Sequence, residues 1–486
     1  MKLRILFLLL LVFLLFCNRK ESVDNTNLLR VGIASDPTTL DPIYSVDLTS
    51  QKINSLLFSK LFRFDREGNV EGELVKEFSF QGNLLRVNLE KVQTKNGASL
   101  TTKDVTYSLN RLKTEKGPRK SRYGFIKSIH IVSDSELEME LDSNSKKYLE
   151  LLALSTASIY EENEHKANGN FKSSGLYFLK KWNKNETIDL ALNQVSENRQ
   201  KEFPSSLVLQ VLNQPSSAIY LFEKGSLDVM KIPYFLMAHP AVRENEKRIV
   251  KGKSVQYIAI NHSNPCFDLP FRKALNLSVN RALIIEKIFE SSASEINASV
   301  TNEYLAQFTK ERFYYPYDVE LAKKNLSESK CFPKITNEVL ELRMRADDEN
   351  KAKGAVLAQY LKELGLKVSI LPMEKTKLYK ENGEKKGDLT LLTWYIDYDS
   401  IYNFIDPILA SDSFGNGGNR SFYANKEVDE YIRKIRINPD EVESPVGIIQ
   451  SINNDAPLVF LWSIHENYIL SKKASQFPTL IDLIVK

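Results

Sequence analysis

A strand–helix–strand unit over residues 340–371 constrains the fold of this chain more than any other feature of its sequence. Residues 340–345 alternate apolar and charged side chains, which is the period of a strand with one buried face. A helical stretch covers 352–364, Gly365 suits the left-handed position that ends a helix, and 366–371 form a second apolar strand. Two strands joined in this way pair in parallel, with a right-handed crossover. The unit therefore predicts an α/β fold with mixed sheets.

A second strand and a capped helix are predicted over residues 84–111. Residues 85–89 alternate in the same way, and Asn96-Gly97 supplies a turn. Residues 101–104, T-T-K-D, read as a capping box that opens a helix with an apolar face. The chain has 486 residues, more than one hydrophobic core usually organises, so two or three lobes are expected.

The order of these pieces resembles the solute-binding proteins of the peptide/nickel class, family 5, which serve ABC importers. Members of that family carry F-x-N-G-x-P-L-T-A-x-D-V-x-Y-S after an extended strand. The matching residues are Asn96-Gly97, Leu100-Thr101, Asp104-Val105 and Tyr107-Ser108-Leu109, whereas Ser99 and Thr102 replace the usual Pro and Ala. We expect this stretch to be a structural signature that does not touch the ligand.

Further segments between residue 28 and the C-terminus resemble the same family. They are the strand 28–33 with the following D-P-T-T-L-D-P at 36–42, residues 56–69, 175–182, 224–229, 256–281 and 317–326. The resemblance implies a bilobed periplasmic-binding-protein-like fold of type II with an extra subdomain. It assigns residues 28–44, 171–256 and 456–486 to lobe I, 45–170 to the subdomain and 257–455 to lobe II.

The N-terminus is typical of an exported protein. Lys2 and Arg4 precede the apolar run Ile5–Phe16, which at about 12 residues is the length of a signal-peptide core and too short to span a bilayer. The end of the run resembles a bacterial lipobox, in which Cys17 is lipidated, although Phe16 replaces the usual small residue. Residues 1–17 are thus expected to be a signal peptide, and 18–27 a tether that holds an extracytoplasmic lipoprotein at the membrane. The alternative is a cysteine that merely ends the apolar run, with cleavage nearby.

Charge and motifs argue against several other classes of protein. The formal net charge is +4 with interleaved signs, so no nucleic-acid surface is indicated. The five histidines show no metal-binding spacing, and residues 415–418 lack the Lys-Ser/Thr of a phosphate loop. We expect a monomer without enzymatic activity, cofactor or metal. Cys266 and Cys331 are read as two thiols, and a disulfide between them is left open.

The ligand site is predicted at the end of an apolar strand over residues 387–395. There Trp394, Tyr395, Asp397 and Tyr398 form an acidic and aromatic cluster. A carboxylate among aromatic rings can hold an ammonium group, and the carboxyl ends of strands in open α/β sheets are common binding sites. The segment resembles the W-x-A-D-Y of the family's peptide binders, in which the Asp pairs with the α-amino group of the peptide. The alternative is a structural strand end.

A ligand carboxylate would need a cationic partner. Arg343, Arg345 and Arg420 are candidates by their place in the chain, and the sequence does not choose among them.

The resemblance implies that the protein captures a short peptide or similar solute between its lobes and delivers it to ABC permease subunits. The alternative is an exported lipoprotein of the same fold that acts as a sensor or adhesion module. A hydrolytic function has no supporting set of residues.

Overall fold

The computed structural model describes residues 27–65, 67–91, 99–168, 171–193, 202–289, 292–440 and 444–485. The predicted signal peptide with Cys17, nearly all of the tether and the Asn96-Gly97 turn lie outside these residues. Within the described ranges, no helix has the length and apolar character needed to cross a membrane.

Lobe I is built on a seven-stranded sheet. In spatial order its strands are β12 (Glu246–Val250), β21 (Glu466–Leu470), β11 (Val229–Ile232), β1 (Leu28–Ile33), β10 (Ser206–Val211), β9 (Thr187–Leu192) and β8 (Tyr177–Asn183). β1 is parallel to β10 and β11, and the other pairs are antiparallel. Apolar residues of α2 (Leu48–Leu57) and α19 (Pro478–Val485) join one core of this sheet, and those of α7 (Pro215–Glu223) and α8 (Pro240–Glu244) join another.

Lobe II is built on a six-stranded sheet. Its strands are, in order, β14 (Ala293–Ser294), β20 (Leu458–Ile464), β13 (Ser254–Ile260), β19 (Leu389–Tyr395), β17 (Val339–Arg345) and β18 (Lys367–Met373). One of its two cores includes α9 (Leu269–Ser278), α12 (Val319–Glu328) and α14 (Asp348–Glu363), and the other includes α15 (Lys375–Gly383), α17 (Lys426–Ile437) and α18 (Val446–Asp455).

The strand–helix–strand unit that we predicted is confirmed. β17 and β18 pair in parallel over their whole length, and α14 connects them. Gly365 ends the helical segment with a φ of +100°, in the left-handed region where glycine has no steric penalty. The predicted mixture of parallel and antiparallel strands is present in both large sheets.

The subdomain holds the other predicted unit. Its antiparallel strands β4 (Val75–Gln81), β5 (Leu84–Leu89), β7 (Glu136–Leu141) and β6 (Ile126–Ile131) share a core with α3 (Thr102–Thr114). The capping box is formed, because the backbone N–H of Thr101 donates to Asp104 Oδ2 at 2.8 Å.

Shorter elements of the chain are β2 (Phe62–Phe64), β3 (Val70–Gly72), α4 (Lys147–Leu152), α5 (Glu162–Asn168), α10 (Arg281–Ile284), β15 (Ile296–Asn297), β16 (Val300–Thr301), α11 (Asn302–Leu305), α13 (Lys334–Asn337) and α16 (Asp406–Leu409).

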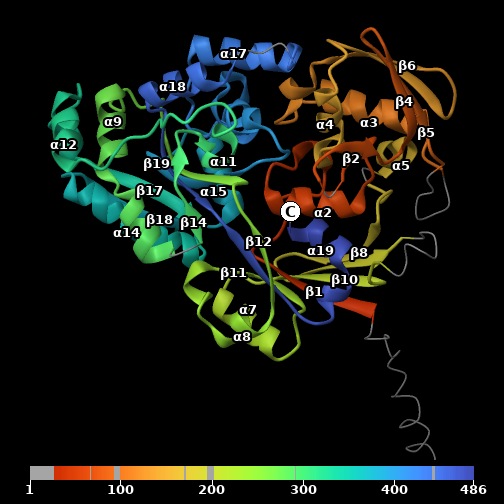
Figure 1. The fold of residues 1–486 in the computed structure, drawn as a ribbon, viewed down its shortest axis with the longest axis horizontal. Coiled ribbons are helices and arrows are strands. Elements are labelled where there is room, and N and C mark those ends of the chain that lie inside the picture. Colours follow the sequence, from red (N-terminus) through yellow and green to blue (C-terminus); the bar gives the residue numbers. More distant parts are fainter. Residues whose placement is uncertain are drawn as a thin grey trace, which may run out of the picture.

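The sheets divide the chain differently from the boundaries at 45, 257 and 456. The buried apolar residues of α2 belong to the core of lobe I. β13 and β20 pair with each other inside the six-stranded sheet, so both belong to lobe II. The boundaries rest on motif matches along the chain, which do not show which strands pair, and this explains the difference. The chain passes between the lobes at residues 251–253 and at His465, and the subdomain lies beside lobe II (Figure 1).

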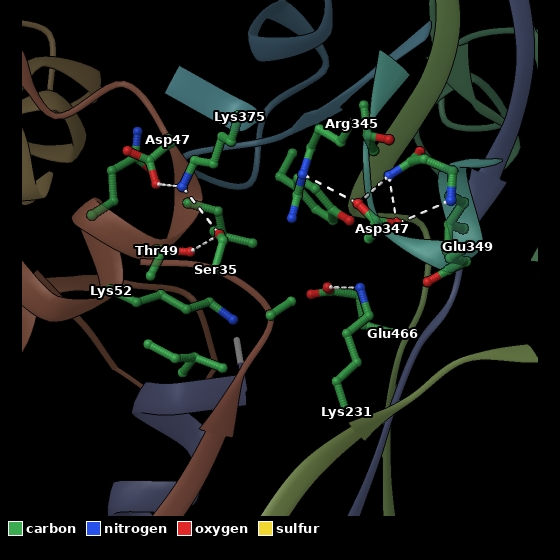
Figure 2. Close-up of a pocket in the computed structure, with 18 of the residues that line it drawn as sticks. Ser35, Asp47, Thr49, Lys52, Lys231, Arg345, Asp347, Glu349, Lys375 and Glu466 are labelled. Atoms are coloured by element: carbon green, nitrogen blue, oxygen red, sulfur yellow. Dashed lines mark hydrogen bonds and ion pairs between the residues drawn. The ribbon is translucent and has the colours of Figure 1, made fainter. Parts of the chain in front are cut away.

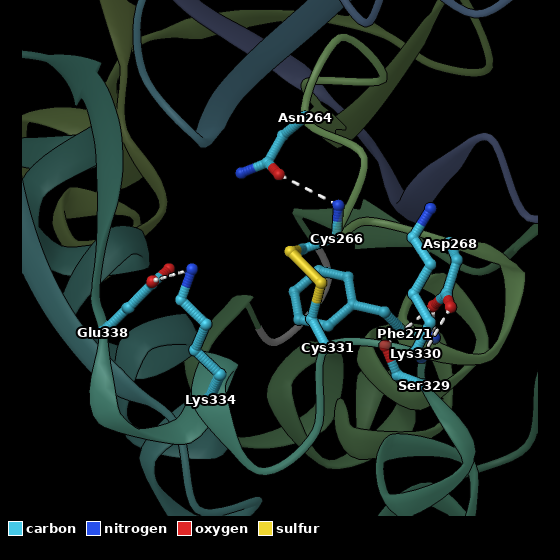
Figure 3. Close-up of a disulfide and its surroundings, with 9 residues drawn as sticks. All are labelled: Asn264, Cys266, Asp268, Phe271, Ser329, Lys330, Cys331, Lys334 and Glu338. Atoms are coloured by element: carbon cyan, nitrogen blue, oxygen red, sulfur yellow. Dashed lines mark hydrogen bonds and ion pairs between the residues drawn. A yellow bond between two sulfur atoms is a disulfide. The ribbon is translucent and has the colours of Figure 1, made fainter.

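A disulfide joins Cys266 and Cys331, so the interpretation as two thiols is wrong. The Cα atoms lie 5.3 Å apart, within the range that a disulfide needs. The bridge links the start of α9 to the segment after α12 (Figure 3). Asp268 holds the same two segments together, because its Oδ1 caps α9 and accepts a hydrogen bond from Ser329 Oγ at 2.8 Å. Only the fold brings these distant residues together.

Replacing both cysteines by serine should lower the free energy of unfolding. The bridge closes a loop with a sequence separation of 65 residues, and a loop of that size stabilises by about 2–4 kcal/mol through the entropy of the unfolded chain. Urea unfolding of the Cys266→Ser/Cys331→Ser protein would measure the loss. Wild-type protein in reductant is the matched control and should show the same loss, whereas equal stability with and without the bridge would contradict the prediction.

Candidate functional site

A cavity of about 260 Å³ lies between the lobes. Its wall combines the end of β1, α2 and β11 from lobe I with the ends of β17 and β19 and the start of α14 from lobe II. The parallel strands β1, β17 and β19 all end at this wall, and the carboxyl ends of such strands are where open α/β sheets bind ligands. The close-up in Figure 2 shows charged side chains of both lobes converging on this space.

Three of the four predicted ligand residues line the cavity. Trp394, Tyr395 and Asp397 are on its wall, and Tyr398 is not. The Trp394 ring is fixed by a hydrogen bond from its Nε1 to the carbonyl of Asn403 at 2.8 Å. Burial raises the pKa of Tyr398, and the nearby Asp406 carboxylate raises it further. The residue therefore lies among buried charged groups outside the cavity wall.

The Asp397 carboxylate is already paired with two arginines of the subdomain. Its Oδ2 accepts hydrogen bonds from Arg119 Nη1 at 2.7 Å and Arg122 Nη1 at 3.0 Å, and all three side chains are at most 4% exposed. Burial alone would raise the pKa of Asp397, but the two guanidinium charges hold it below its ordinary value. Both guanidinium groups also lie near the Trp394 ring, 5.8 and 5.9 Å from its centroid. This cluster joins the subdomain to lobe II.

The net charge of this cluster is +1, which bears on the ammonium role predicted for Asp397. At an effective dielectric constant of about 20, two unit charges interact by about 4 kcal/mol at 4 Å and by about 2 kcal/mol at 8 Å. Two guanidinium repulsions at about 8 Å thus cancel the attraction of an ammonium to one carboxylate at about 4 Å. The arginines lie 278 and 275 residues away in the chain, so sequence reasoning missed them. Only the G-P-R-K-S-R turn at 117–122 offered a signal.

Every other carboxylate on the cavity wall in the described structure also has a cationic partner. The pairs are Asp47 with Lys375 at 2.5 Å, Glu466 with Lys231 at 2.7 Å, Glu349 with Lys353 at 2.6 Å and Asp347 with Arg345 at 3.3 Å. Lys52 differs, because within the described ranges no carboxylate lies within 4 Å of its amine. Lys52 donates to the carbonyl of Val485 at 3.1 Å and extends from α2 toward the cavity (Figure 2).

The three arginines considered for a ligand carboxylate have different positions. Arg345 lines the cavity beside Asp347. Arg343 is on the same strand but pairs with two glutamates, Glu341 at 2.6 Å and Glu381 at 3.0 Å. Arg420 is buried and donates to the carbonyl of Tyr379 at 2.9 Å. Only Arg345 is placed to meet a ligand.

Lys375 connects the two lobes directly. From the first turn of α15 in lobe II, its Nζ donates to Asp47 Oδ1 at 2.5 Å, Ser35 Oγ at 3.2 Å and the carbonyl of Asp36 at 3.1 Å. Asp47 is the N-cap of α2, whose backbone and side chains add hydrogen bonds to the carboxylate. The lobes are therefore in contact across the cavity in this structure.

A metal centre is not formed by the described residues, which contain no group of three His, Cys, Asp or Glu side chains suited to hold an ion.

Comparison with known proteins identifies the family and the fold. Residues 81–416 match the model of bacterial extracellular solute-binding proteins, family 5. The chain is 22% identical to the probable D,D-dipeptide-binding periplasmic protein DdpA of Escherichia coli (strain K12), over 93% of this chain and 91% of that protein. It is 24% identical to the oligopeptide-binding protein AppA of Bacillus subtilis (strain 168), over 89% and 85%.

The solved structures include the periplasmic binding protein DppA from Helicobacter pylori in complex with the peptide STSA. It superposes with a TM-score of 0.82 at 19% identity, over 93% of this chain and 98% of that one. This likeness confirms the predicted periplasmic-binding-protein-like fold. Because the family model matches more than half of its length, the chain belongs to the bacterial extracellular solute-binding proteins of family 5.

Proposed function

We propose that this protein captures a short peptide between its lobes outside the cytoplasm and delivers it to the permease of an ABC importer. The observation that carries the proposal is the cavity enclosed by both lobes in a chain of this family. Relatives named for dipeptides and oligopeptides support a peptide as the solute. Proteins of the family are binding components of transport systems and not enzymes.

The cavity favours a small solute. Its volume of about 260 Å³ is just below the range of about 300–1,000 Å³ that is usual for small-molecule sites. Two sets of ion pairs border it. Lys375 with Asp47 joins the two lobes, and Asp397 with the arginines joins lobe II to the subdomain. A peptide of a few residues suits such a space better than a long chain. Trp394 and Tyr395 can cover its apolar parts.

Movement of the lobes would couple binding to delivery. In the described part of the chain the lobes are joined by two chain crossings, which are the natural hinge. A solute that touches both lobes stabilises the closed state by the contacts that the open state lacks. The cross-lobe ion pairs favour the same state, so the bound solute and the built-in pairs act together.

The membrane anchor remains part of the proposal. Lipidation of Cys17 would hold the protein near its permease, and residues 18–27 would serve as the tether. Mass spectrometry of the membrane fraction should find a diacylated Cys17 at the mature N-terminus if this is correct.

Peptides should stabilise the protein in a thermal-shift screen. We would compare residues 18–486 with pools of di- to pentapeptides, with sugars and with nickel chelates. A ligand at about 100 times its dissociation constant adds about 2.7 kcal/mol to the free energy of unfolding, which is a clear shift. No shift with any peptide pool would contradict peptide binding and would favour the sensor or adhesion function.

Replacing Lys375 by methionine should open the cleft. The change leaves the buried Asp47 without its cation, and removing one partner of a buried ion pair costs about 3–5 kcal/mol. This cost falls on the closed state, so small-angle X-ray scattering without ligand should show a larger radius of gyration. Lys377→Met is the matched control, because Lys377 lies on the same helix, is exposed and should leave the radius unchanged. Equal radii of gyration for Lys375→Met and wild type would show that the ion pair of Lys375 and Asp47 does not hold the lobes together.

Acid should destabilise the protein through the carboxylates of the cavity. Burial alone would raise the pKa values of Asp47, Glu349, Asp397 and Glu466, but their cationic partners lower all four below the ordinary values. A lowered pKa contributes stability that is present above the pKa of the unfolded chain, near pH 4, and is lost as the pH falls through the folded value.

Through these four groups, the free energy of unfolding should fall from about pH 4 downward, by about 1.4 kcal/mol per pH unit for each proton taken up. Denaturant titrations between pH 3 and 7 would measure this. Asp47→Asn removes one of the groups and should reduce the acid slope, and an unchanged slope would show that the pair of Asp47 and Lys375 contributes nothing.

A further inference from the structure

The paired state of Asp397 leaves two buried donors without partners. Among the described residues, Arg119 Nε and Arg122 Nη2 have no hydrogen-bond partner, although both side chains are at least 96% buried. Buried polar groups in folded proteins are almost always paired, and an exception calls for a partner that is not yet in place. Two guanidinium groups share the Asp397 carboxylate here, so the cluster lacks acceptors for two of its donors.

Of the two arginines, only Arg119 lines the cavity. It shares the wall with Trp394 and Asp397, and its side chain is 3% exposed there. Arg122 makes the same pair with Asp397 from behind this wall. An acceptor supplied by the solute would meet Arg119 first, and its negative charge would balance the excess charge of the whole cluster.

The remaining charges of the cavity point in the same direction. Within the described residues, all five carboxylates of the wall are paired, so none is left for a solute ammonium without breaking an ion pair. Two cations of the site lack a carboxylate of their own within the described residues: the second arginine shares Asp397 with the first, and Lys52 lies near Glu466, which already pairs with Lys231. A guanidinium group presents a planar fork that suits the two oxygens of a carboxylate or phosphate.

We propose that Arg119 binds an anionic group of the solute, a carboxylate or a phosphate, and that Asp397 orients Arg119 instead of holding an ammonium. The proposal rests on the function proposed above and specifies its substrate class as peptides recognised by an acidic end or side chain. The ligand group bound near Asp397 is thereby negatively charged, whereas the resemblance to the W-x-A-D-Y segment implies a positively charged ammonium group. Asp397 is a positioning residue, and Arg119 is the residue that contacts the solute.

Calorimetry with trialanine tests the proposal in three forms of the peptide: with both ends free, with an amidated carboxyl end and with an acetylated amino end. Amidation of the carboxyl end should weaken binding to the wild-type protein at least tenfold, whereas N-acetylation should change it less than threefold. In Arg119→Gln the dissociation constant of the amide should exceed that of the free acid by less than threefold. In the matched control Arg122→Gln, which loses a pair with the same carboxylate but keeps Arg119 on the cavity wall, the amide should still bind more weakly than the acid, by a larger factor than in Arg119→Gln.

Other outcomes would overturn the assignment. Loss of binding on N-acetylation with tolerance of the amide would restore the ammonium role of Asp397. An acid preference that survives in Arg119→Gln but disappears in Lys52→Met would place the anion at Lys52. If Arg119→Gln does not fold, Arg119→Lys keeps the charge without the planar fork, and its ratio of amide to acid dissociation constants should fall at least threefold.

Small anions separate this inference from the peptide function. Succinate and inorganic phosphate are added to wild type, Arg119→Gln and Arg122→Gln in thermal-shift assays. If no trialanine form binds but an anion raises the melting temperature of wild type and not of Arg119→Gln, the anion site stands and the peptide function fails. A larger shift with succinate than with phosphate would then indicate a carboxylate as the bound group, and the reverse would indicate a phosphate. If peptides bind and neither their acid preference nor any anion response depends on Arg119, the inference fails and the peptide function stands.

Discussion

The arrangement of the lobes depends on charges that are buried and paired across the cleft. Lys375 reaches from lobe II to Asp47 of lobe I, and Asp397 of lobe II meets Arg119 and Arg122 of the subdomain. Each ion would carry a penalty of several kcal/mol if it were dehydrated without its partner. The partners are therefore coupled to one relative position of the lobes. Hydrophobic packing stabilises each lobe internally, while these pairs specify how the lobes meet.

Such pairs are a weak source of net stability but a good source of geometric specificity. The desolvation of both ions cancels most of their mutual attraction, so these pairs make the closed arrangement of the lobes only slightly more stable than the open one. A small difference is what a transport component needs, because a solute can shift an equilibrium only by its differential affinity for the two states. The additional donors of Asp47, namely Thr38 and Ser50, hold its carboxylate in place on the lobe I side, so that closure orders few new groups.

Local features of this structure were predictable from the sequence, and long-range partners were not. The β17–α14–β18 unit and the capped helix α3 follow from periodicity and capping over fewer than 40 residues. The disulfide between Cys266 and Cys331 needed the mutual position of α9 and α12, and the lobe boundaries needed the pairing of β13 with β20. Trp394, Tyr395 and Asp397 were placed on the cavity wall because a strand carries them there. The chemistry of Asp397 is set by residues from another part of the chain.

A motif therefore predicts where a side chain lies more reliably than what it binds. The segment from Trp394 to Tyr398 follows from a strand that ends at the cleft, and β19 thereby places Asp397 on the cavity wall. Whether that acid meets a solute ammonium depends on whether an internal cation has reached it first. In this protein the turn at 117–122 supplies two, and the local charge changes from −1 to +1. Since ion pairing in a buried site is governed by net charge, one turn in the subdomain can reverse the preference of the cavity while the strand, its aromatic residues and the fold stay the same.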